Sequence, residues 1–198
     1  MVFRIRGEGI VEGLQVGGLP DGTVDVDTLA ADSVTTPKVN YSGAIVQVVQ
    51  VVKSNVFSTT SSTFNPAIVD NLSGVITPSS ANNAILVNFN INQVGGNTDS
   101  EAVIAWRCNG TGIFEHTDYS ASHTSGTFGL GMNWTDGTWQ GETASAWFVH
   151  QPQATTPQNY YCALGGNGSA TVYLNRSGRG NFNDARVASS LILMEIQQ

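Results

Sequence analysis

Charged side chains are scarce in this chain, and their scarcity excludes whole classes of partner. Only 12% of the 198 residues are charged, and eight Lys and Arg stand against fifteen Asp and Glu, so the formal net charge is -7. Because the basic residues are spread along the sequence without a cluster that could neutralise phosphates, we expect neither nucleic acid nor an anionic membrane as a partner. So few charges also predict that copies of the chain cover much of its surface.

Signals for export and for a disulfide framework are missing as well. No apolar run is long enough for membrane insertion, and residues 1–7 lack the apolar core and cleavage site of a secretory signal, so we expect folding in a cytoplasm. Cys108 and Cys162 are the only cysteines, too few for a disulfide scaffold and not spaced for zinc. We expect two buried free thiols; a disulfide is the alternative.

Motifs for catalysis are equally absent. The Gly-rich stretches at 126–131 and 165–168 are not followed by Lys-Ser/Thr or by a helical pattern, and Gly-x-Ser-x-Gly does not occur. His116, His123 and His150 have no spacing that makes metal ligands converge within one element, although three copies of one His could meet on a symmetry axis. We therefore predict no catalytic residue, no cofactor and no metal.

The composition of the chain changes near residue 42 and divides the sequence into two parts. Residues 1–42 form an arm with three basic and six acidic side chains, in which residues 23–29 resemble residues 33–39 at a ten-residue offset. Each copy offers two apolar side chains, too few for a core, so we expect them to contact partner chains. These residues are Val24, Leu29, Val34 and Val39. A flexible linker is the alternative.

The body, residues 43–198, is rich in Gly, Ser, Thr, Asn and Val, which favour strands and turns. Asn109-Gly110 predicts a type I′ hairpin that places Trp106 opposite Ile113, and Asp136-Gly137 predicts a second one. About eight to ten short strands are typical of an all-β, antiparallel β-sandwich of the jelly-roll type. The clearest expected strands are 44–53, 85–92, 101–108, 144–150, 159–164, 170–174 and 188–196.

The first and last of these strands are apolar almost throughout. Gln47 and Gln50 fall on opposite faces of the first strand, which indicates a strand buried on both faces. We expect the two strands to be neighbours in one sheet, so that the end of the arm lies beside the C-terminus. Val48 and Leu193 are then candidates, with the four arm residues, for the interface between copies.

Acidic and aromatic side chains crowd residues 99–142. Paired carboxylates there could cleave a polysaccharide, but no spacing selects a pair from Glu101, Glu115, Asp118, Asp136 and Glu142. A binding surface is a better interpretation of this stretch than catalysis: Tyr119, Trp134 and Trp139 offer flat faces to sugar rings, and Asp136 accepts hydroxyl hydrogen bonds. For Trp134 and Trp139, however, we favour a structural role, in which they stabilise their own hairpin across its strands or fill the core.

Three stretches resemble short fibre, spike and other adhesin-like virion proteins of tailed bacteriophages. Gly18-Leu19-Pro20-Asp21-Gly22-Thr23-Val24 through Val34-Thr35-Thr36-Pro37-Lys38-Val39 is similar to the linkers that precede fibre heads. Gly43–Gln50, with Val75–Ser80 and Ala84–Val87, resembles the opening of such a head, and Ser190–Ile196 its closing strand. Residues 95–185 match nothing in that family.

The resemblance implies a homotrimeric head on an N-terminal attachment arm, located in the virion. Its partners would be further copies of itself, other tail or capsid proteins, and the polysaccharide of the host surface. The arm is shorter than is usual in the family, so a capsid-decorating or head-fibre protein is the alternative to a tail fibre or spike, and a polysaccharide depolymerase is a third. Attachment would fall to Phe3, Ile5, Val11, Leu14 and Leu19.

Overall fold

A computed structural model describes residues 4–5, 11–12, 42–62, 65–97, 100–113, 127–132, 141–167, 171–177 and 186–198. The chain forms two compact units, Met1–Asn40 and Tyr41–Gln198. In the first unit, β1 (Arg4–Ile5) pairs antiparallel with β2 (Val11–Glu12). The attachment candidates Ile5 and Val11 are Cα partners in this ladder. Phe3, Leu14, Leu19, Val24, Leu29, Val34 and Val39 lie outside the described residues.

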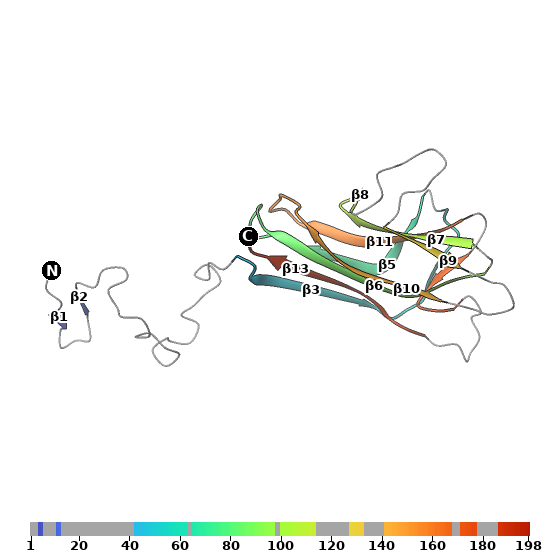
Figure 1. The fold of residues 1–198 in the computed structure, drawn as a ribbon, viewed down its shortest axis with the longest axis horizontal. Coiled ribbons are helices and arrows are strands. Elements are labelled where there is room, and N and C mark those ends of the chain that lie inside the picture. The colour runs from blue at the N-terminus through green and yellow to red at the C-terminus, as the bar shows by residue number, and fades with distance from the viewer. Residues whose placement is uncertain are drawn as a thin grey trace. The chain divides into compact units, whose positions relative to one another are not determined.

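The second unit is an all-β, sandwich-like structure of two antiparallel sheets (Figure 1). We call the first sheet S1. Its main path is β3-β13-β6, and β10 pairs with the other edge of β6, while the short β12 and β4 continue S1 at one end. The second sheet, S2, has the order β5-β11-β7, and both β8 and β9 pair with β7.

These strands have the following bounds: β3 Ile45–Lys53, β4 Phe57–Thr59, β5 Ala67–Ile76, β6 Ala84–Gly96, β7 Ser100–Cys108, β8 Thr111–Gly112, β9 Phe128–Met132, β10 Glu142–His150, β11 Gln158–Gly166, β12 Val172–Leu174 and β13 Ser189–Ile196. The described part of the chain contains no helix, and so none that is long and apolar enough to cross a membrane. The predicted all-β, antiparallel architecture is confirmed.

The core lies between the inner faces of S1 and S2. In β6, Ile85, Val87, Phe89 and Ile91 are buried and point inward, because successive side chains of a strand alternate between its faces. The Phe89 ring lies 4.6 Å from the ring of Trp106 on β7, measured between centroids. Each such apolar side chain contributes about 1.5–3 kcal/mol when fully buried, so this interior is a large stabilising contribution to the sandwich.

The first and last strands of this unit are neighbours, as predicted. β3 and β13 pair antiparallel, with Val49 opposite Leu193, and the Gly43 amide donates to the Gln197 carbonyl at 2.6 Å. The start of β3 and the C-terminus therefore lie at the same end of the sandwich (Figure 1). We call it the proximal end, and the opposite end, where β3 finishes at Lys53, the distal end.

The prediction that β3 is buried on both faces is wrong within the single chain. Val48 and Val52 are each 57% exposed. The sandwich has only two layers, so one face of an S1 strand meets S2 and the other points outward.

Two local predictions are confirmed. Asn109 and Gly110 have φ of 50° and 90°, the positive values that a type I′ turn requires, and the Ile113 amide donates to the Trp106 carbonyl at 2.8 Å. Cys108 and Cys162 are both buried and free. They point into the core from the neighbouring strands β7 and β11, where burial raises the pKa of each thiol.

Candidate functional site

The outward face of S1 carries a continuous set of apolar side chains, which we call the apolar outer face. Strand register places Met194 of β13 between Val48 of β3 and Leu86 of β6, with Val149 of β10 beyond Leu86. A cross-strand row of four apolar residues therefore spans the sheet. The complete face comprises Ile45, Val48, Val52, Leu86, Trp147, Val149, Ile192, Met194 and Ile196.

This face is open to solvent in the single chain. Trp147 is 52% exposed, Val149 58% and Ile45 54%. The face is four strands wide, at about 4.8 Å per strand, and eight residues long, at about 3.3 Å per residue. The area of the whole face is therefore on the order of 500 Å² per copy. Contiguous apolar patches of a few hundred Å² mark surfaces that bind another molecule.

Between Ser145 and Val149 of β10, and along β3, β6 and β13, the outward positions carry no charge. The polar residues there are Gln50, Asn88, Asn90, Asn92, Ser145 and Ser190, and the exposed Glu142 lies beyond them at the distal end of β10. The single charged residue of β3, Lys53, and the single charged residue of β13, Glu195, both point inward and are each 1% exposed.

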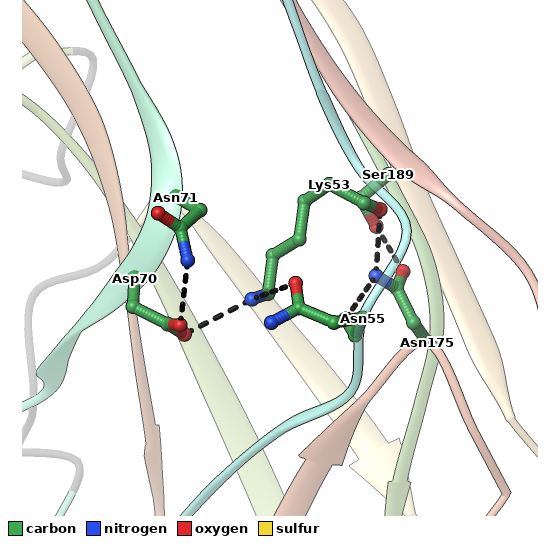
Figure 2. Close-up of polar contacts among 6 residues, drawn as sticks. All are labelled: Lys53, Asn55, Asp70, Asn71, Asn175 and Ser189. Atoms are coloured by element: carbon green, nitrogen blue, oxygen red, sulfur yellow. Dashed lines mark hydrogen bonds and ion pairs between the residues drawn. The ribbon is translucent and has the colours of Figure 1, made fainter.

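Lys53 is held at the distal end by a polar network between the sheets (Figure 2). Its Nζ donates to Asn55 Oδ1 at 2.8 Å and forms an ion pair of 3.0 Å with Asp70 of β5. The Nδ2 of Asn175 donates to the Lys53 carbonyl at 2.9 Å, and Ser189 Oγ donates to Asn175 Oδ1 at 2.6 Å. The buried ammonium group of Lys53 therefore has two oxygen partners, Asn55 and the charged Asp70, which compensate for the loss of water.

Glu195 is held at the proximal end in the same manner. Its Oε1 accepts hydrogen bonds from the amide and hydroxyl of Ser79 and from Asn83 Nδ2, each at 2.7 Å. Burial by itself raises the pKa of this carboxyl group, but the hydrogen bonds from Asn83, Ser79 and the Ser80 backbone outweigh it, so the net pKa is lowered. Glu195 therefore stays ionised inside the sandwich.

The structure separates the two interface candidates of the body. Val48 belongs to the apolar outer face, whereas Leu193 is 0% exposed and belongs to the core. Leu193 cannot contact another copy while the sandwich is intact, because neighbouring residues of β13 point to opposite faces. Ile192 and Met194, the neighbours of Leu193 in β13, point outward. They replace Leu193 as the interface candidates of this strand.

The sugar-binding candidates Tyr119, Trp134, Asp136 and Trp139 lie outside the described residues. Two residues flank the segment 133–140 and can be placed. Met132 pairs with Ser100, and Gly141 precedes Glu142, which pairs with Val94. Both flanking residues therefore lie at the distal end, away from the start of the head.

Other candidates of the sequence analysis do not form a catalytic or metal site among the described residues. His150 Nδ1 lies 2.8 Å from the Tyr160 hydroxyl, and burial lowers the pKa of the imidazole. No group of three or more His, Cys, Asp or Glu that could hold a metal occurs in the part of the chain that the structure describes. Glu101 and Glu142 are exposed, and His116, His123, Glu115 and Asp118 lie outside the described residues.

One polar arrangement was missed by sequence analysis. Arg176 and Arg186 are Cα partners in an isolated antiparallel bridge at the distal end, although ten positions separate them. The Arg176 guanidinium lies 4.0 Å from the centre of the Tyr173 ring. Three of the eight basic residues fall between positions 176 and 186, but no local pattern predicts that Arg176 and Arg186 pair.

Comparison with known proteins assigns no family to this arrangement: neither a family model nor a curated protein matches the chain.

Proposed function

We propose that this chain is a structural protein of a bacteriophage particle, a homotrimeric tail fibre or spike component that adsorbs to host-surface glycans. The observation that carries the proposal is the uncharged apolar outer face, which is suited to contact with other copies. The sequence resemblance to phage fibre heads supplies the viral part of the proposal.

The strand order supports a jelly-roll-like head. S1 runs β3-β13-β6-β10 and S2 runs β5-β11-β7-β9, while the chain passes from one sheet to the other at most of its connections. Two interlocked Greek keys produce this alternation. In such a head, the start of β3 and the C-terminus share the proximal end, and the distal end is the proposed place for the ligand.

Apolar burial would hold three copies together. Three faces of on the order of 500 Å² turned toward a common axis bury roughly 1,500 Å², which lies in the range of specific protein interfaces. Contacts between three arms would add to this area. The apolar part of this area would stabilise the trimer by about 25 cal/mol per Å² at most, and the entropy lost on association opposes it.

The oligomer is tested first. Sedimentation of the purified full-length protein at micromolar concentration should give three times the chain mass of 20.9 kDa. A monomer, or a dimer, would overturn the trimer.

The adsorption role is tested next, with the same preparation on a panel of immobilised bacterial lipopolysaccharides and capsular polysaccharides. Saturable binding to at least one of them is the expected result. Binding to none, together with firm binding to empty phage capsids, would replace adsorption by capsid decoration.

A further inference from the structure

The most exposed side chains of the apolar outer face lie along its two margins. More than half exposed are Ile45, Val48 and Val52 on β3, at one margin, and Trp147 and Val149 on β10, at the other. The outward residues of the middle strands β13 and β6 are half-buried or buried, because a strand on either side shields them. The face therefore has two different apolar margins, which we call the β3 margin and the β10 margin.

A rotation axis along the strands brings these unlike margins together. In a closed ring of three copies every contact is heterologous, so one patch of each copy meets a different patch of the next copy. The β3 margin of one copy then meets the β10 margin of the next. An axis in this direction also gathers the three starts of β3 at one end, as a common point of attachment requires.

Strand pairing gives the height of each residue along such an axis. Through the pairings of the two middle strands, the register places Trp147 of β10 at about the same height as Gln50 of β3. Val48 and Val52 lie two positions to either side of Gln50 and point to the same face. Rotation leaves these heights unchanged, so Trp147 of one copy comes opposite Gln50 of the next, between Val48 and Val52.

We propose that Trp147 of each copy packs between Val48 and Val52 of the next copy and donates its Nε1 hydrogen to Gln50 Oε1. The inference rests on the proposed trimer and names the side chains through which the copies recognise each other. Trp147 is then the anchor of the contact between copies.

The chemistry of the two margins is complementary at this height. A Trp side chain removes about 150–250 Å² from water when it is buried, and its N–H group then needs an acceptor. The branched side chains of the β3 margin provide apolar surface on both sides of the ring, and the exposed amide of Gln50 provides the acceptor. Trp is also enriched among the few residues that carry most of the binding energy of an interface.

The test places one thiol on each margin and leaves the anchor intact. Ser145 and Val52 are exposed, and the register places them at about the same height. The full-length Ser145→Cys/Val52→Cys variant is treated with a bifunctional maleimide of about 10 Å span, close to the spacing of packed sheets. Covalent trimers on a denaturing gel are the expected product. Neither single variant should give them, and wild-type protein, with two buried cysteines, is the blank.

Ser145→Cys/Ile45→Cys is the matched control. Ile45 is nearly as exposed as Val52 and lies on the same margin, but it is seven residues away, or about 23 Å along the strand. The crosslinker cannot span this distance, so the yield of covalent trimers should not exceed that of the single variants.

Substitutions measure the weight of the anchor. Trp147→Ala should raise the protein concentration at which half of the trimer dissociates by about tenfold or more. Ile68→Ala, which removes an equally exposed side chain from S2, should change it by less than about twofold. Trp147→Phe and Gln50→Ala each remove the hydrogen bond, so their effects should be similar and should not add in the double variant.

Several outcomes would overturn this contact. Covalent dimers from either single variant would show that like margins meet, and products of the double variant that stop at dimers would show a two-fold contact. If wild-type protein sediments as a trimer but the Val52 pair crosslinks no better than the Ile45 pair, the contact fails while the trimer survives. A wild-type monomer by sedimentation would overturn the trimer itself.

Discussion

The outward faces of the two sheets differ although both carry exposed valines. On S2, Ile68 is 58% and Val75 54% exposed, but the charged Glu101 is also exposed on the same sheet. On S1, Val48 is 57% exposed and belongs to a row of apolar residues across four strands without a charge. Single exposed apolar residues are ordinary on protein surfaces, whereas continuous uncharged rows are not. The comparison makes the outer face of S1 the better candidate for the proposed contact with another copy.

The placement of charge within S1 strengthens this conclusion. Lys53 and Glu195 are buried, and each needs several hydrogen bonds to offset the loss of water. At an outward position of a monomer, either side chain would be hydrated at no cost. β3 and β13 instead direct their only charges into the sandwich and keep the outer face neutral. An inward charge on an edge strand also discourages edge-to-edge pairing, which favours contact through the face.

The largest expected effect comes from placing a charge on one face or the other. In the proposed trimer, Val48→Asp introduces three carboxylates into the interface, where their desolvation outweighs the burial that they replace. We expect a folded monomer by sedimentation at micromolar concentration. Val75→Asp makes the same change at nearly equal exposure on S2 and should remain trimeric. Trimers in both variants, or monomers in both, would remove the distinction between the faces.

A smaller effect separates the inner and outer sides of β13. Leu193→Ala leaves a cavity in the core and should lower the free energy of unfolding by about 2–5 kcal/mol. Met194→Ala, one position away, should change it by less than about 1 kcal/mol in the monomeric Val48→Asp background. In the otherwise wild-type chain, Met194→Ala should instead raise the protein concentration at which trimers dissociate. Chemical denaturation and sedimentation measure the two quantities, and equal unfolding costs for both substitutions would contradict the assignment of their sides.

Local sequence signals predicted most of the long strands, and the exception has a physical cause. Alternation in β6 and β7 is regular, so their inward residues could be read directly. In β5, Asp70 and Asn71 are both exposed, and Asn71 has φ of 55°. The β5–β11 register shifts beside this point. Two residues of β11, from Tyr161 to Ala163, span five residues of β5, from Ser73 to Ile68, so β5 has three extra residues at this bulge. The bulge breaks the period of two, and for this reason no run of alternating residues predicted β5.

The interface and the arginine pair depend on pairings that sequence does not encode locally. β3 and the end of β13 are apolar at nearly every position, so their composition could not distinguish Val48 from Val49 or Leu193 from Met194. A shift of one residue in register exchanges the two faces of a strand. The pairing of Val49 with Leu193 puts these two residues on one side, and the full burial of Leu193 identifies that side as the inner one. Arg176 and Arg186 were treated as scattered charges because nothing local predicts their bridge.

The smallest expected effect concerns the charge that β13 directs inward. The carboxyl pKa of Glu195 is lower in the folded protein than in the unfolded chain, where it is about 4.3. The folded state therefore binds this proton less readily, so the contribution of Glu195 to stability is complete above the unfolded pKa and is lost as the pH falls through the folded value.

We expect Glu195→Gln in the monomeric Val48→Asp background to lower the free energy of unfolding by about 1–2 kcal/mol at pH 7. The difference from the parent variant should shrink toward zero as the pH approaches 3, and denaturant titrations between pH 3 and 8 measure it. Glu142→Gln removes an exposed carboxylate from the outermost strand β10 and should stay within about 0.5 kcal/mol of the parent variant at pH 7. A Glu195→Gln difference that is independent of pH would mean that shape, and not ionisation, fixes this side chain. The difference between the inner and outer sides of β13 would then not depend on the charge of Glu195.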